Sequence, residues 1–257
     1  DSSNVNIVNP ASYALLSAGK PILNVSGISH ISRFETLTDT LETSLFGLNN
    51  VVLSFPIRDN WGFTIGLNPF SKVGYKIQER KFFDDKNVRT SYIGTGAINK
   101  VFAGLAYRPL NNKNNQLSIG FNIGYMFGTL SRARSQEFTD VVTHFNTKSI
   151  QSLKINDLYF DAGLIYSRKI NRKSSISAGF TYELGKKLKA ERETYTYSFS
   201  GSLENENYLD TIGYSLEADG SIQTPHKFGV GISYEIFGNR DYQDDKLRLE
   251  QISSNVQ

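Results

Sequence analysis

Strict alternation of apolar residues with small or polar residues is the strongest pattern in this chain. Between residues 117 and 127, apolar or aromatic residues stand at every odd position, and Ser, Gly, Asn or Met stand at every even one. Alternation with a period of two predicts a β-strand that has one apolar face. The length of this stretch agrees with the roughly 9 to 11 residues that a tilted strand needs to cross a bilayer.

The same alternation recurs along the chain. Including a poorer stretch at 21–33, it predicts about eight strands, whose other members lie near residues 51–57, 61–67, 101–107, 158–166, 176–184 and 228–236. The second face of these strands is rich in glycine and polar residues, as expected for a face that looks into a hydrated lumen. The sequence therefore predicts an all-β fold, a transmembrane antiparallel up-and-down β-barrel.

The connections between the predicted strands differ in length. Short segments rich in turn-forming residues lie at 58–60, 109–115, 171–174 and 237–241. Longer polar segments lie at 35–43, 80–90, 137–149 and 201–219. Bacterial outer-membrane barrels have short periplasmic turns and longer extracellular loops. We therefore expect the protein to lie in the cell outer membrane, with the long connections outside the cell.

Composition agrees with strands and excludes several other classes. The chain has 17 Phe and 14 Tyr, and 21 Gly against 6 Pro, a mixture that suits a pleated sheet. No apolar run approaches the roughly 18 to 20 residues of a membrane-spanning helix. Because the chain has no cysteine, disulfides and thiolate metal sites are excluded. The net charge of +3 comes from scattered residues, so we expect no nucleic-acid partner.

No pattern of catalytic, cofactor-binding or metal-binding residues is recognisable. The three histidines, His30, His144 and His226, stand far apart and without ligand spacing. Residues 94–99 begin like a dinucleotide-binding loop but lack its third glycine and a following helix. The acidic cluster at Asp241, Asp244 and Asp245 is interpreted as a solvated turn. We expect neither an enzyme nor a bound cofactor or metal.

Polar residues on the glycine-rich face are the candidate lumen residues. They are Asn122, Asp157, Asp161, Glu183 and Glu235. Asp157 and Asp161 share one face of a strand but stand roughly 13 Å apart, at about 3.3 Å per residue. That separation is too wide for a catalytic carboxylate pair, so we interpret both as luminal polarity.

Two short motifs resemble the FadL-like outer-membrane transport family in the form found in Bacteroidota. One is the turn Asn9-Pro10-Ala11, and the other is the segment 68–75, which reads Asn-Pro-Phe-Ser-Lys-Val-Gly-Tyr. The resemblance implies a fourteen-stranded barrel with an amino-terminal plug in its lumen. Residues 1–20 then represent a remnant of the plug, and residues 21–257 represent the barrel. We expect this barrel to be incomplete, because little chain precedes Asn9 and no terminal aromatic strand ends the sequence.

Three functions remain open from the sequence. The first, implied by the resemblance, is passage of hydrophobic small molecules across the outer membrane. The alternative is a structural or accessory barrel subunit of a larger Bacteroidota outer-membrane secretion or assembly complex. The third is a soluble β-sandwich. The expected partners are membrane lipid and lipopolysaccharide, together with a hydrophobic ligand for the first function or other outer-membrane proteins for the second.

Overall fold

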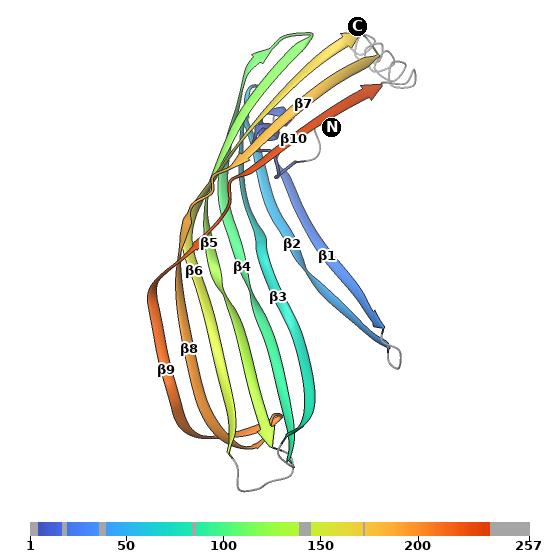
Figure 1. Cartoon of the computed structure of the whole chain (residues 1–257). Coiled ribbons are helices and arrows are strands. Elements are labelled where there is room, and N and C mark those ends of the chain that lie inside the picture. The colour runs from blue at the N-terminus through green and yellow to red at the C-terminus, as the bar shows by residue number, and fades with distance from the viewer. Residues whose placement is uncertain are drawn as a thin grey trace.

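The structure, a computed structural model, describes residues 5–16, 20–35, 40–83, 86–138, 145–171 and 173–236. These residues form the short 3-10 helix η1 (Pro10–Leu15) and a single antiparallel sheet (Figure 1). The strands are β1 (Ile22–Glu35), β2 (Thr40–Arg58), β3 (Trp61–Phe83), β4 (Lys86–Asn111), β5 (Asn115–Phe138), β6 (Asn146–Asn171), β7 (Ser174–Glu183), β8 (Lys187–Ser202), β9 (Asn205–Gln223) and β10 (Lys227–Ile236). No helix in the described ranges has the length and apolarity needed to span a membrane.

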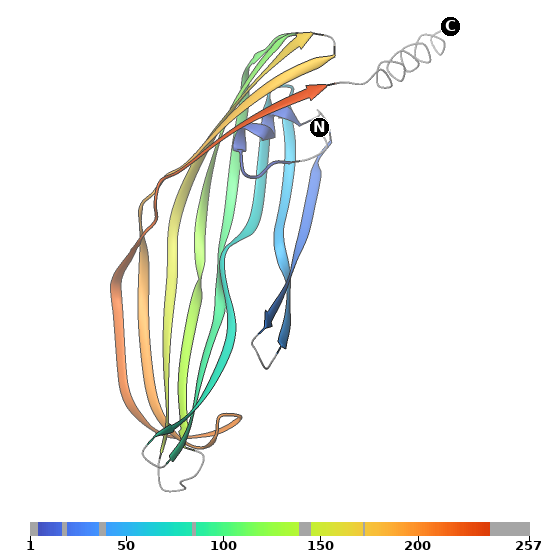
Figure 2. The same ribbon diagram turned by 45° about the vertical axis from the view of Figure 1, so that its right-hand side comes forward.

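The ten strands make eight passes up and down the sheet. β7 and β8 pair with successive parts of the same strand, β6, and β10 and β9 pair with β7 and β8 in turn. β7 and β8 therefore form one long strand path with an interruption, and β9 and β10 form another. The sheet curves like the wall of a barrel (Figure 2) but is not closed, because β1 and β10 end the strand order without pairing to each other. The predicted all-β, up-and-down fold is confirmed.

The two faces of the wall differ as the alternation predicts. On β5, Phe121 and Tyr125 of the outer face are 54% and 42% exposed, whereas Asn122 and Met126 of the inner face are at most 3% exposed. Residues that pair across β4, β5 and β6 share a face, so Val101, Tyr125 and Leu158 form one outward row. We call the outward apolar rows at the level of residues 117–127 of β5 the apolar band.

The strands continue far beyond the apolar band. β4 and β6 each have 26 residues and β5 has 24. Residues 128–138 of β5 add roughly 35 Å at about 3.4 Å per residue. We call this part of the sheet the distal extension, and it ends at the turns drawn lowest in Figure 1.

The expectation of long loops at 80–90 and 201–219 is wrong. β3 runs to Phe83 and β4 begins at Lys86, while most of the second segment lies in β9. These stretches are rich in polar and charged residues, as loops are, but the strands remain paired across them. Residues 36–39 and 139–144 lie outside the described residues. So do residues 237–241, where a short turn is expected.

Side chains supplement the backbone hydrogen bonds where the two strand paths are interrupted, at residues 184–186 and 224–226. The Nδ1 atom of His226 accepts a hydrogen bond of 3.2 Å from the amide of Gly185. Thr224 Oγ1 accepts from the amide of Lys186 at 3.1 Å, and Asp157 Oδ2 accepts from the amide of Lys189 at 2.9 Å. The backbone donors near the interruption thus keep partners, which buried or lipid-facing amides require.

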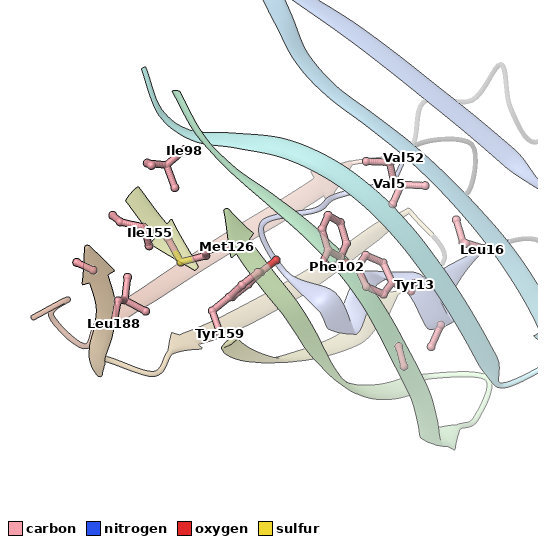
Figure 3. Close-up of a cluster of buried hydrophobic side chains, with 13 residues drawn as sticks. Val5, Tyr13, Leu16, Val52, Ile98, Phe102, Met126, Ile155, Tyr159 and Leu188 are labelled. Carbon is pink, nitrogen blue, oxygen red and sulfur yellow. The ribbon is translucent and has the colours of Figure 1, made fainter. Parts of the chain in front are cut away.

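The core lies on the inner face, where η1 packs against the sheet. We call η1 the plug for its position on the wall, while the expectation that residues 1–20 are the remnant of a barrel plug stays a prediction. Tyr13 and Ala14 of η1 are buried together with Val52 of β2 and Phe102 of β4 (Figure 3). The η1 backbone lies directly on inward glycines of the wall. A Cβ atom at Gly62 would overlap the carbonyl oxygen of Tyr13, so the absence of a side chain there makes room for the plug.

Gly62→Ala is expected to destabilise the fold because the new methyl group meets the plug backbone. Overpacking of this kind costs about 1 to 3 kcal/mol. Gly74→Ala, farther along the same strand, is the matched control because a Cβ there meets no atom within 4 Å. Denaturant unfolding of both variants in detergent measures the difference. Equal stability of the two variants would contradict the docked position of η1.

Candidate functional site

The plug is anchored through the Asn9-Pro10-Ala11 motif. Asn9 is the N-cap of η1, and its Oδ1 accepts a hydrogen bond of 3.1 Å from the amide of Ala11. Its Nδ2 donates to the carbonyl oxygens of Leu164 at 3.2 Å and Phe180 at 3.4 Å. One side chain therefore starts the helix and ties it to β6 and β7, so the motif is a helix start.

The opposite end of η1 is tied to the wall by Arg108 of β4. Its Nη2 donates to the carbonyl oxygen of Ala14 at 2.6 Å and to that of Asp59 at 3.1 Å. The guanidinium thereby joins the last turn of the plug to the turn between β2 and β3. Both ends of η1 are thus hydrogen-bonded to strands far away in the sequence.

Beside the plug, charged side chains surround a small cavity on the inner face. Glu183 accepts from Lys100 at 3.2 Å and from Lys227 at 2.9 Å. The Lys100 ammonium also lies over the rings of Phe70 and Tyr159, 4.6 and 4.4 Å from their centroids. The cavity has a volume of about 300 Å³. Its lining therefore carries both signs of charge beside apolar and aromatic side chains.

Three of the five candidate lumen residues line this cavity. Asn122 Nδ2 donates to Asp161 Oδ1 at 2.7 Å, and Glu183 stands on the neighbouring strand. Asp157 lies apart, at the interruption beside β8, where it binds Lys186 at 2.7 Å. Glu235 lies on β10 and accepts from Ser175 at 3.4 Å. Because the sheet is open, the lumen-facing role of all five stays a prediction.

Lys100 and Lys227 are site residues that the sequence reasoning missed. Both lie among aromatic and small residues, and Lys100 occupies an inward position of β4 where small or apolar residues otherwise stand. A lysine at such a position needs a carboxylate partner when buried. A lysine at an inward strand position was therefore the signal that could have indicated a buried ion pair. Its partner, Glu183, is distant in the sequence, so the sequence alone does not identify the pair.

The described residues contain no group of three or more His, Cys, Asp or Glu side chains that could hold a metal ion. His226 takes part instead in the interruption of the wall, where its Nδ1 also lies 2.8 Å from the Tyr182 hydroxyl. The acidic cluster at Asp241, Asp244 and Asp245 lies outside the described residues.

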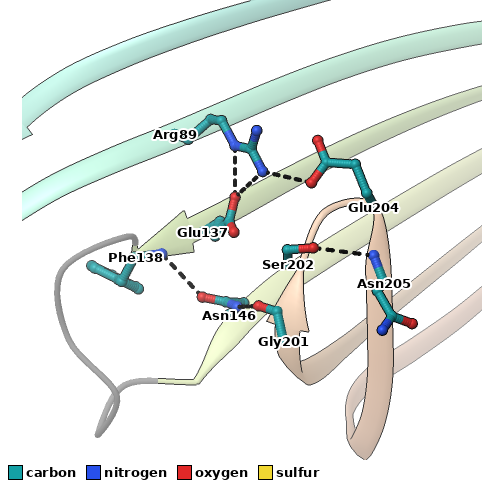
Figure 4. A network of polar contacts seen from close by, with 8 residues as sticks. All are labelled: Arg89, Glu137, Phe138, Asn146, Gly201, Ser202, Glu204 and Asn205. Carbon is teal, nitrogen blue, oxygen red and sulfur yellow. Dashed lines mark hydrogen bonds and ion pairs between the residues drawn. The ribbon is translucent and has the colours of Figure 1, made fainter.

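At the end of the distal extension, the turn between β8 and β9 is held to Arg89 of β4 and Asn146 of β6. Arg89 binds Glu137 at 2.6 Å and Glu204 at 2.9 Å (Figure 4). Asn146 donates from Nδ2 to the carbonyl oxygen of Gly201 at 2.8 Å. We call these five residues the distal clasp. Arg89 and Glu137 have side chains only 16% and 9% exposed, so solvent screens their ion pair less than a surface one.

The clasp is sensitive to pH through Glu204. The hydrogen bond from Arg89 lowers the pKa of the Glu204 carboxyl below its ordinary value. The contact with Arg89 is therefore fully present above the ordinary glutamate pKa and is lost as the pH falls through the lowered value.

An antiparallel up-and-down wall with an apolar outer face and a short helix packed on its inner face defines an all-β, barrel-like protein. The chain matches the BamG family over residues 1–241. It belongs to this family, which is associated with the Bam complex, the β-barrel assembly machinery of the outer membrane. Comparisons with curated proteins and with solved structures find no match.

The family match corrects the resemblance to the FadL-like transport family, which is wrong. The expectation of fourteen strands came only from that resemblance and has no support apart from it. Its motifs have local structural explanations instead. Asn9-Pro10-Ala11 combines an N-cap with a proline in the first helical turn, a combination that many helices share. The segment 68–75 lies inside β3, which continues through it with one register shift.

Asn9→Ala is expected to loosen the plug, because it removes the N-cap and two bonds to the wall. Loss of an N-cap costs about 0.5 to 2 kcal/mol, so amide exchange in residues 9–15 is expected to accelerate up to roughly thirtyfold. Hydrogen–deuterium exchange with mass spectrometry measures this. Asn49→Ala, which removes one exposed side-chain contact with Ser26, is the control. Unchanged exchange in the plug of Asn9→Ala contradicts the anchoring.

Arg89→Gln is expected to release the turn between β8 and β9, because both carboxylates lose their cation. Cleavage by a glutamate-specific protease at Glu204 or Glu206 then becomes faster than in the unaltered protein. Arg192→Gln removes a half-exposed pair with Glu217 at 3.5 Å and serves as the control. Equal cleavage rates for both variants show that the clasp does not hold the turn.

Proposed function

We propose that this protein is an accessory subunit of the outer-membrane β-barrel assembly machinery. The match to the BamG family over residues 1–241 carries this proposal. In this role the protein is a scaffold that lies in the membrane beside the proteins that insert new barrels. Transport of hydrophobic compounds has no comparable support, since the family match points away from it and η1 is bonded to the wall at both ends.

The apolar band supports a position in the outer membrane. Its outward side chains are large and apolar. In membrane barrels, apolar residues that face lipid alternate along each strand with residues that face inward, and the strands of the band follow this pattern. Beyond the band, charged residues appear on both faces of the distal extension. Since outer-membrane barrels carry their long elements outside the cell, we place the distal extension on the cell surface.

The open sheet edges support contact with other β-proteins. On β10, the outward side chains Val230 and Ile232 are 80% and 76% exposed, against 38% and 42% for Ile176 and Phe180 of the paired strand β7. Unpaired backbone groups at membrane depth cost several kcal/mol each, so a lipid-exposed edge is unfavourable. We propose that neighbouring assembly proteins cover the β10 edge.

We also propose that the protein acts without catalysis or a resident cofactor. The inner-face carboxylates serve structural contacts: Asp161 accepts from Asn122, and Glu183 joins two lysines. Such an arrangement stabilises the packing of the wall around the plug. It also leaves partner binding, rather than a reaction, as the activity to be measured.

The test is purification of a tagged full-length protein from native membranes. We expect the membrane-embedded component of the barrel assembly machinery to co-purify in a near-stoichiometric amount. We also expect depletion of the protein to lower the folded amount of other outer-membrane barrels. Isolation without assembly proteins, together with unchanged barrel levels after depletion, contradicts the proposed function.

A photo-crosslinking amino acid at Ile232 tests the contact at the sheet edge. We expect crosslinks to an assembly protein from this position, because β10 has an open side. Ile119 is the matched control, since it faces outward in the middle of the wall and is 44% exposed. Equal protein crosslinking from both positions contradicts a partner specific to the edge.

A further inference from the structure

The outer face changes from apolar to polar at one edge of the apolar band, and on β6 the change brings in a lysine. Along β6, the outward residues are Leu158, then Asn156, then Lys154. Their inward neighbour Ile155 is 5% exposed, which establishes that these even-numbered residues point outward. If the band lies in hydrocarbon, this edge lies at the depth of the lipid headgroups.

A hollow lies on the outer face at this edge, between β6, β8 and β9. Its volume is about 420 Å³, and its polar lining consists of Lys154, Asn156, Lys187, Lys189, Glu191, Asp219 and Ser221, three lysines against two carboxylates. On β8, the inward residues Leu188 and Ala190 are 1% and 4% exposed, so the alternate lysines point outward. Three lysines from two adjacent strands thus converge on the hollow.

The charges of the hollow are only partly balanced within the wall. Lys154 binds Glu191 at 3.4 Å, and the nearby Lys186 is held by Asp157 at 2.7 Å. Among the ion pairs of the described residues, none involves Lys187 or Lys189. Two ammonium groups therefore stand at the band edge available for an anionic group, and lysine binds phosphate well as a point charge.

We propose that the hollow binds the phosphate-bearing headgroup of a membrane lipid. The inference rests on the membrane position given under the proposed function. Lys187 and Lys189 contact the phosphate, while the acyl chains lie along the apolar band beside Leu158 and Leu184. Asp219 and Ser221, on the β9 side of the hollow, accept hydrogen bonds from an amine or hydroxyl group of the headgroup. The site thereby fixes the height of the wall in the membrane.

Native mass spectrometry of the full chain in detergent tests this site. The added probes are phosphatidylethanolamine, phosphatidylglycerol, lipid A, diacylglycerol and inorganic phosphate. We expect the phosphate-bearing lipids to bind and diacylglycerol, which lacks phosphate, not to bind. The double variant Lys187→Gln/Lys189→Gln is expected to bind roughly tenfold or more weakly, since each lysine near an anionic surface contributes about fivefold.

A matched double variant separates the hollow from general attraction to the membrane surface. Lys72→Gln/Lys76→Gln removes the same charge from exposed lysines of β3, and Lys72 lies in the same row as Lys154. We expect lipid binding by this variant to remain unchanged. Equal losses in both double variants, or no loss in either, overturn the proposal.

Further measurements identify the source of the phosphate. They also separate lipid binding from the proposed role in barrel assembly. Binding of inorganic phosphate as strong as that of the lipids, and lost with the same lysines, overturns the lipid assignment. A weaker affinity of Asp219→Asn for phosphatidylethanolamine but not for phosphatidylglycerol supports recognition of the headgroup amine. Co-purification of the Lys187→Gln/Lys189→Gln variant tests the assembly role independently, so failure of lipid binding leaves that result intact.

Discussion

Hydrogen bonding between neighbouring strand backbones is the interaction on which the remaining features of this protein rest. It continues from β1 to β7 and holds each residue to one face of the wall. Where the ladder is interrupted near residues 184–186, Asp157, Thr224 and His226 supply the missing acceptors. A buried donor without a partner would cost about 1 to 3 kcal/mol, so these side chains stabilise the sheet where its backbone ladder is interrupted.

The fixed faces then determine what the wall can hold. Glycines on the inner face let the η1 backbone approach the strands, as at Gly62, and Asn9 and Arg108 secure its two ends. Beside the plug, Glu183 forms ion pairs with two lysines, Lys100 and Lys227. Where η1 lies, the inner face is therefore covered by the protein's own chain. The outer face, the strand edges and the distal extension are surfaces that stay open to other molecules.

The sequence predicts most of the fold but only part of the site. Alternation marks the strands of the apolar band because each apolar residue is followed by a small or polar one. It fails in the distal extension, where Arg89 and Glu137 are polar yet lie in paired strands, so a composition typical of loops hides β-structure. The contacts of Asn9 with Leu164 and Phe180 join positions far apart in the chain. No local pattern contains that information, and the same limit explains why Lys100 was missed.

The position of the plug has a consequence for the order of folding. The strands pair with sequence neighbours through short connections, and contacts between near neighbours form early because they close small loops. Asn9, in contrast, binds carbonyls on β6 and β7 that follow it by 155 and 171 residues. The helix η1, which precedes every strand of the wall in the described residues, is thus among the last elements to find its place. During that interval the glycine-lined face of a newly formed wall stands uncovered, which makes the arrival of η1 a natural final step in the maturation of the chain.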